Sequence, residues 1–158
     1  MIKSITLSSL TQRSVGVGAE QIAVIAYSPL CQGILAGKFR KLEEVPDDFR
    51  KNNRFVTAGQ FPAVASFVGK LAAIAERLQK PAAAVALRWV LERQGLVSAI
   101  VGASSPAQVD QNLQALGWKL PSSEKDELDA LSAPFSAGIK PHDSLWNWHP
   151  REKVAKFS

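Results

Sequence analysis

Hydrophobic positions along the chain change period several times, as they do in proteins that alternate strands with helices. Ile22–Tyr27 is a short continuous apolar run that ends at Ser28-Pro29, a pattern typical of a strand buried on both faces in a parallel sheet. Val97–Val101 is a second run of this kind and leads into Gly102. Lys3–Leu10 is a candidate third strand.

Helical periodicity predicts four helices. It is clearest across Val64–Leu78, where apolar residues recur three and four positions apart. Pro81–Arg93 opens with proline and is apolar almost all round, so it must be covered on several sides. Ser105 and Pro106 begin a third helix as its N-cap and first residue, and Ser123–Leu131 forms the fourth. The third helix has an apolar face made of Val109, Leu113 and Leu116.

Two segments lack a clear period. Arg40–Gln60 is polar, and a long irregular segment inside a domain is usually functional or mobile. Pro134–Ser158 is predicted to be an irregular tail. The alternation of strands and helices indicates the α/β class. Because each strand runs into a loop that leads to a helix, the strand ends should point the same way, toward the usual ligand site of α/β proteins.

Composition limits the class of protein. A chain of 158 residues suits one domain, and 46% apolar with 21% charged residues excludes a disordered chain. No apolar run reaches the roughly 18 residues of a membrane span, and Met1–Ser14 is too polar for a secretory signal. We therefore expect no membrane partner. The lone Cys31 cannot form an intrachain disulfide, which fits a cytoplasmic location.

The net charge of +5 makes an anionic ligand plausible. Basic residues are densest over Lys38–Arg54, but acidic residues interrupt them, and the tryptophans do not alternate with lysine and arginine. We therefore expect no nucleic-acid partner. The chain has no HExxH, CxxC, GxSxG or P-loop pattern, so nothing in the sequence supports a zinc protease, an α/β-hydrolase or a P-loop nucleotidase. We assign no metal site.

Three segments, in order, resemble the aldo/keto reductase family. AYSPLCQGILAGKF (Ala26–Phe39) resembles its seventh strand and following loop, IVGASSPAQVDQNLQAL (Ile100–Leu116) its eighth strand and helix, and VALRWVL lies between them. The resemblance covers about Gln21–Ala133, which leaves residues 1–20 as a divergent N-terminal segment and 134–158 as a tail. It implies a partial TIM (β/α)8 barrel, the last two βα units plus extra helices. Since so few strands cannot close a barrel, we expect self-association to bury their edges.

The family resemblance also implies a cofactor site, because both matched ends hold the nicotinamide dinucleotide there. Tyr27 resembles the ring that stacks on the nicotinamide. The loop residues resembling those along the diphosphate are Ser28, Leu30, Gln32 and Gly33, and the cations for the phosphates are Lys38 and Arg54. Gly102 and Ser104 precede a helix N-terminus, which favours anions. By resemblance the adenosine half contacts Gln108, Gln111 and Asn112.

Most of these residues also have plainer interpretations. Ser-Pro-Leu alone is only a turn, exposed charges are common, and Gln108 stands at capping-box spacing from Ser105. Family habit favours NADP(H), whereas the neutral Ser104 and Gln111 leave NAD(H) open.

The family's reductive chemistry uses a tyrosine, a lysine, an aspartate and a histidine from the first half of its barrel. This chain has one tyrosine, matched to the stacking position, and His142 and His149 lie in the tail. Cys31 would need an exposed, electropositive setting to react. We therefore assign no catalytic residue.

Three functional hypotheses stay open. The first is a truncated NADP(H)-binding half that is weak or inactive alone. The second is an active carbonyl oxidoreductase whose site is rebuilt in an oligomer with Tyr27 or His149. The third is a structural or interaction fragment without a ligand. Cofactor titration separates the third from the others, and turnover with a carbonyl panel separates the second from the first.

Overall fold

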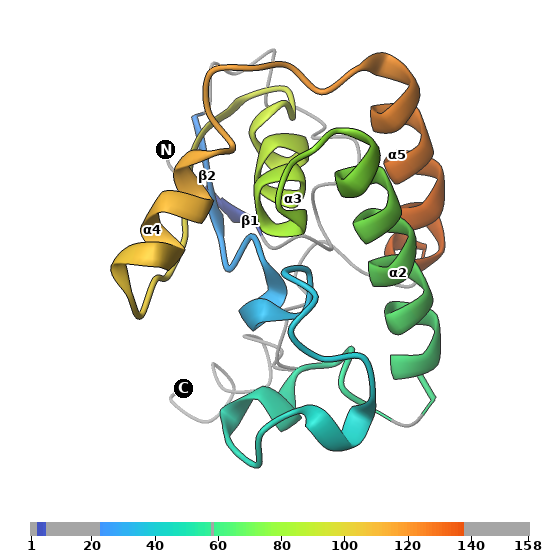
Figure 1. The fold of residues 1–158 in the computed structure, drawn as a ribbon. Helices are drawn as coiled ribbons and strands as arrows, with labels where there is room; N and C mark the ends of the chain where they lie inside the picture. The colour runs from blue at the N-terminus through green and yellow to red at the C-terminus, as the bar shows by residue number, and fades with distance from the viewer. Residues whose placement is uncertain (1–2, 6–22, 58, 138–158) are drawn as a thin grey trace, which may run out of the picture.

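The computed structural model describes residues 3–5, 23–57 and 59–137 (Figure 1). Its sheet has three strands, β1 (Lys3–Ile5), β2 (Val24–Tyr27) and β3 (Leu96–Ile100), in the order β1-β2-β3. Both strand pairs are parallel, as the sequence predicted for the two main strands. The candidate strand near the N-terminus is confirmed for residues 3–5, and its residues 6–10 lie outside the described ranges.

Four helices follow the predicted order, α2 (Phe61–Arg77), α3 (Ala82–Leu91), α4 (Pro106–Leu113) and α5 (Ser122–Ser136). The α/β class is therefore confirmed. Helix α3 contacts β3, α2 and α4, and α2 also contacts α5, so α3 lies between the sheet and the α2/α5 pair (Figure 1). Among the described residues, no helix is long and apolar enough to cross a membrane.

Apolar packing between α2, α3 and α5 forms the main core. The periodic residues of α2 are buried as predicted, including Leu71 and Ile74 at 0% exposure. The rings of Phe67 and Trp89 lie 6.2 Å apart between centroids, and Phe135 of α5 meets Phe67 edge-on at 5.8 Å. Helix α3 is buried on nearly every side, which explains why its sequence carries almost no polar face.

A polar network fastens α3 to α5. The Asp129 carboxylate accepts hydrogen bonds from Trp89 Nε1 at 2.6 Å, from Lys125 Nζ at 2.9 Å and from the Arg93 guanidinium. Burial raises the pKa of Asp129, but the hydrogen bonds from Lys125, Trp89 and Arg93 outweigh it, and the pKa lies below its usual range. These hydrogen bonds and ion pairs therefore connect α5 to α3 and to Arg93 just beyond its end.

Two helix ends differ from the sequence prediction. Pro81 is the N-cap of α3 rather than its first residue, because its ψ of 142° is extended. Helix α5 runs through Pro134 to Ser136, so residues 134–136 are helical instead of part of an irregular tail. The remaining predicted tail, with His142 and His149, lies outside the described residues.

The prediction that the second strand is buried is wrong. Val97 and Ile100 of β3 are 63% and 59% exposed, and within the described ranges β3 pairs with a strand on one side only. The apolar face predicted for the third helix is uncovered as well, since Val109 and Leu113 of α4 and Leu116 just beyond its end are 45–57% exposed. These residues form an open apolar face beside the sheet edge.

Candidate functional site

The turn after β2 carries an unusual concentration of left-handed backbone. Ser28, Cys31 and Gln32 have φ values of 51°, 49° and 59°, and Gly33 follows at 95°. Non-glycine residues rarely adopt this region, and such conformations cluster where a backbone must approach a ligand or hold a side chain. The structure thus places strained backbone where the resemblance implied a diphosphate loop.

Asn53 holds this turn from the opposite side. Its side chain is 1% exposed, and Nδ2 donates to the Gln32 Oε1 at 3.1 Å and to the Cys31 Sγ at 3.4 Å. Its Oδ1 accepts from the Phe55 N–H at 3.0 Å. The buried amide therefore joins the turn to the irregular segment 39–57. Removing a buried hydrogen-bonding partner costs about 1–3 kcal/mol.

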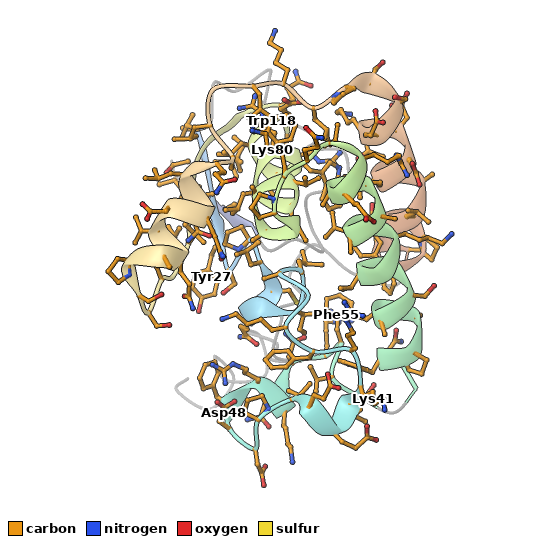
Figure 2. The ribbon with its side chains drawn as sticks, in the orientation of Figure 1. Tyr27, Lys41, Asp48, Phe55, Lys80 and Trp118 are labelled. Atoms are coloured by element: carbon orange, nitrogen blue, oxygen red, sulfur yellow. The ribbon has the colours of Figure 1, made fainter. Side chains whose placement is uncertain are left out.

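One cleft of about 520 Å³ gathers most of the predicted cofactor residues, a volume within the usual range for ligand sites. Its lining includes eleven of the twelve, all except Arg54: Tyr27, Ser28, Leu30, Gln32, Gly33, Lys38, Gly102, Ser104, Gln108, Gln111 and Asn112. Figure 2 shows Tyr27 at the end of β2 on the side where α4 lies. The carboxyl ends of β2 and β3 meet at this cleft, as expected for adjacent parallel strands.

Gly33 and Lys38 form one wall of the cleft together. A Cβ on Gly33 would lie 3.2 Å from Cδ of Lys38, so the lysine stem packs against the bare glycine backbone. Its exposed position keeps the ammonium group in reach of an anion. A larger residue at position 33 would displace this stem and also strain the backbone at φ 95°.

The N-terminus of α4 forms the other wall. Ser105 caps it by accepting from the Gln108 N–H at 3.3 Å, as predicted. The Gln108 side chain, however, reaches Ser104 and not the N-cap backbone, since its Oε1 accepts from Ser104 N at 3.0 Å and Oγ at 3.2 Å. Gln108 thereby ties the β3–α4 loop to the first turn of α4. The capping box is incomplete, because the Gln108 side chain does not bond the backbone N–H of Ser105.

Sequence reasoning missed eight lining residues of the cleft, and two of these come from the irregular segment 39–57. Phe49 and Arg50 line the cleft from a 3-10 turn, η3 (Phe49–Asn52), which Asp48 caps through the Arg50 N–H at 2.9 Å. The predicted cation Arg54 does not line it. The sequence signal that could have pointed to Arg50 was the basic run Lys38–Arg54. Which cations of this run line the cleft depends on the path of the backbone, and the sequence does not give that path.

Cys31 is buried beneath the cleft instead of lining it. Burial raises the pKa of its thiol from 9.0 to about 11, partly offset by the hydrogen bond from Asn53. A protonated, inaccessible thiol is a poor nucleophile. Within the described ranges, no group of three or more His, Cys, Asp or Glu residues is placed to hold a metal ion.

Comparison with known proteins gives a consistent result. The model of the aldo/keto reductase family matches residues 16–133. Uncharacterized oxidoreductases of Mycobacterium tuberculosis and Mycobacterium bovis are 37% identical over 140 residues, 87% of this chain and 41% of theirs. An NADH-specific methylglyoxal reductase of Escherichia coli is 32% identical over 99 residues, 63% of this chain and 30% of that protein.

Among solved structures, a glycerol dehydrogenase of Gluconobacter oxydans superposes with a TM-score of 0.74 at 27% identity. The match covers 89% of this chain and 45% of that one. The chain thus spans about two fifths of the length of the mycobacterial relatives and less than half of the solved one.

The buried Cys31 predicts a pH-dependent stability. Between pH 9 and 11 the unfolded thiol loses its proton while the folded thiol keeps it, so the free energy of unfolding falls as pH rises through this window. A shift of this size corresponds to about 2–3 kcal/mol by pH 11. Urea unfolding from pH 8 to 11 should show a steeper loss for the native chain than for Cys31→Ala. If the free energy of unfolding fell equally with pH in the two proteins, the raised pKa of Cys31 would be contradicted.

Proposed function

This chain belongs to the aldo/keto reductase family, and on that basis we propose that its cleft binds a nicotinamide dinucleotide. Family habit favours NADP(H), with NAD(H) as the alternative. The observation that carries the proposal is the convergence of eleven residues, chosen from two distant sequence segments, on one cleft. Parallel strands explain this convergence, because their carboxyl ends share one edge of the sheet.

Each wall of the cleft suits one part of such a ligand. Tyr27 presents a ring that is 43% exposed, suited to stacking on a flat nicotinamide. Lys38 offers an ammonium group to the phosphates from one wall, and the positive end of the α4 dipole faces them from the other. The neutral polar side chains Gln108, Gln111 and Asn112 suit the adenosine half.

We further propose that the chain is part of a (β/α)8 barrel that carries the cofactor half of the site, and that alone it reduces carbonyl compounds weakly. Hydride delivery to a carbonyl leaves an alkoxide that must be protonated, which needs a positioned acid. The one tyrosine, Tyr27, is matched to the stacking position. A cytoplasmic location is proposed from the single reduced cysteine.

A second copy of this chain is the partner we propose for the open apolar face. A groove of about 400 Å³ lies between α3, β3 and α4, and no charged side chain lines it. Two copies of an uncharged groove can pack together without charge repulsion, whereas the rest of the chain carries the net charge of +5. A two-fold axis would pair β3 with its copy and bury Val97 and Leu113.

Cofactor binding should depend on Lys38. Lys38→Ala should weaken the binding of NADPH by about 1–2 kcal/mol, since a charge-assisted hydrogen bond is lost, and added salt should weaken binding to the native chain. Fluorescence titration measures both effects. Lys70→Ala, an exposed substitution on α2 away from the cleft, is the control. Affinity that responds neither to Lys38→Ala nor to salt would place the phosphates elsewhere.

Carbonyl reduction by this chain should stay near background. The missing acid alone predicts a rate about 10²–10⁴-fold below that of a complete enzyme. NADPH oxidation with reactive aldehydes, in protein freed of host reductases, provides the measurement. Robust turnover would contradict the proposal, and its loss in Tyr27→Phe or His149→Ala would identify a rebuilt site.

Self-association should depend on the apolar face. Light scattering at micromolar concentration should report a dimer for the native chain and a monomer for Val97→Asp, because the charge lies on the proposed contact. Ser66→Asp, an exposed position on α2, should remain dimeric. A native chain that is monomeric and binds no hydrophobic dye would rule out this partner.

A further inference from the structure

Helix α4 and the loop before it separate the cleft from the apolar groove. Val101, Ala103 and Asn112 line both pockets, so one layer of chain forms the wall between them. Val101 and Ala103 belong to the loop between β3 and α4, and Asn112 lies near the end of α4. A change in the position of this wall therefore alters both pockets at once.

The two sides of α4 differ in chemistry. Gln108 and Gln111 line the cleft, whereas Val109 and Leu113 line the groove. Residues three and four apart lie on one face of a helix, so α4 presents a polar face to the cleft and an apolar face to the groove. The side chains suited to the adenosine half are thus carried by a helix whose apolar face is uncovered.

Helix α4 is held by few contacts. None of its residues is buried, and its main contact with another helix or strand is with α3. Figure 1 shows it at the side of the molecule, away from α2 and α5. A helix this short depends on packing for its stability, and segments with few buried contacts open at low cost in free energy. The Ser105 cap fixes its first turn, so the rest depends on what covers the apolar face.

A small apolar cluster joins α3 to the segment after α4 and reaches both pockets. Its buried members are Ala84, Leu87 and Ala115, and Leu30, Leu91 and Val101 pack against them. Leu30 lines the cleft, and Leu91 lines the groove. Packed side chains therefore run without interruption from one pocket to the other, as energetic coupling between two sites requires.

We propose that α4 couples the groove to the cleft, so that a chain whose groove is covered by a second copy binds the nicotinamide dinucleotide more tightly than a single chain does. This inference rests on the proposed function, both for the cofactor and for the second copy. Covering the groove removes the apolar face of α4 from water and so holds the helix in place. The cofactor then meets an ordered wall and does not bear the cost of ordering it.

The second copy is the occupant that both sides of the groove suit. On one side, the outer edge of β3 offers backbone N–H and C=O groups that an identical edge strand can pair with. On the other side, Leu113 and Leu116 are 55% and 57% exposed. A two-fold axis that pairs β3 with its copy brings these apolar residues of both chains into one interface. Each chain then covers the α4 wall of the other.

Equilibrium dialysis of the full chain against NADPH, at protein concentrations below and above the dissociation constant of the dimer, tests this coupling without any substitution. Light scattering supplies the dissociation constant of the dimer. Affinity for NADPH should be about five- to tenfold higher in the dimer than in the monomer, within the usual range of coupling between two sites.

Two substitutions on opposite sides of the groove provide a second test. Val97→Asp on β3 and Leu116→Asp beyond α4 place a charge in the groove, and neither residue lines the cleft. Both variants should stay monomeric and bind NADPH with the same low affinity at every protein concentration. The matched control, Ser66→Asp on the exposed side of α2, should behave as the native chain. Circular dichroism checks that each variant is folded.

Coupling is reciprocal, so saturating NADPH should also tighten the dimer. Because a dimer holds two cofactors, its dissociation constant should fall by the square of the factor found for one site, about 25- to 100-fold. Light scattering of the native chain with and without NADPH measures this change. A dimer whose dissociation constant is the same with and without NADPH overturns the coupling.

The remaining outcomes separate this inference from the proposed function. A native chain that binds no NADPH overturns the proposed cofactor, and one that binds but never dimerises overturns the proposed second copy. The coupling falls with either. A native chain that does both, with one affinity for NADPH at all protein concentrations, overturns the coupling alone, even if the variants bind more weakly. Tighter binding by the monomer overturns it as well.

Discussion

The buried amide of Asn53 donates to both Cys31 and Gln32, and these two hydrogen bonds join the turn after β2 to the segment 39–57. The turn at residues 28–33 contains three non-glycine residues in the left-handed region, a conformation that persists only where surrounding contacts impose it. Asn53 supplies such contacts from 21 residues away in sequence. The same amide positions η3, so Arg50 and the diphosphate loop are placed by one interaction.

Features of the fold and of the cleft that depend on residues close together in sequence could be predicted, and those that depend on distant residues could not. Helices α2 and α3 were predictable because periodicity and local residue types determine them, as for Leu71 and Trp89. The apolar run of β3 could not reveal its exposure, because the same residues suit an inner strand and an edge strand. Arg50 was missed because its place depends on Asn53 and on the Asp48 cap, and neither leaves a periodic signal.

The open edge of the sheet bears directly on what the chain can do. In a closed barrel a strand such as β3 would have neighbours on both sides, and the site would receive residues from several strands. In the described residues, β3 instead presents Val97 and Ile100 to solvent, while the cleft at its carboxyl end keeps the residues suited to a cofactor. Under the function we propose, cofactor recognition and carbonyl chemistry depend on different parts of the fold, and this segment carries the residues for the first.

Amide chemical-shift mapping with NADP+ tests the central claim most directly, because it reports where on the chain the ligand lies. The account predicts saturable shifts at the backbone amides of Gly33, Lys38, Gly102, Ser104 and Asn112, which come from both walls of the cleft. Amides of α2 should not move, since no residue of α2 lines the cleft, and α3 separates α2 from α4 (Figure 1). Shifts confined to one wall, shifts elsewhere on the surface, or no shifts at millimolar NADP+ would contradict the account.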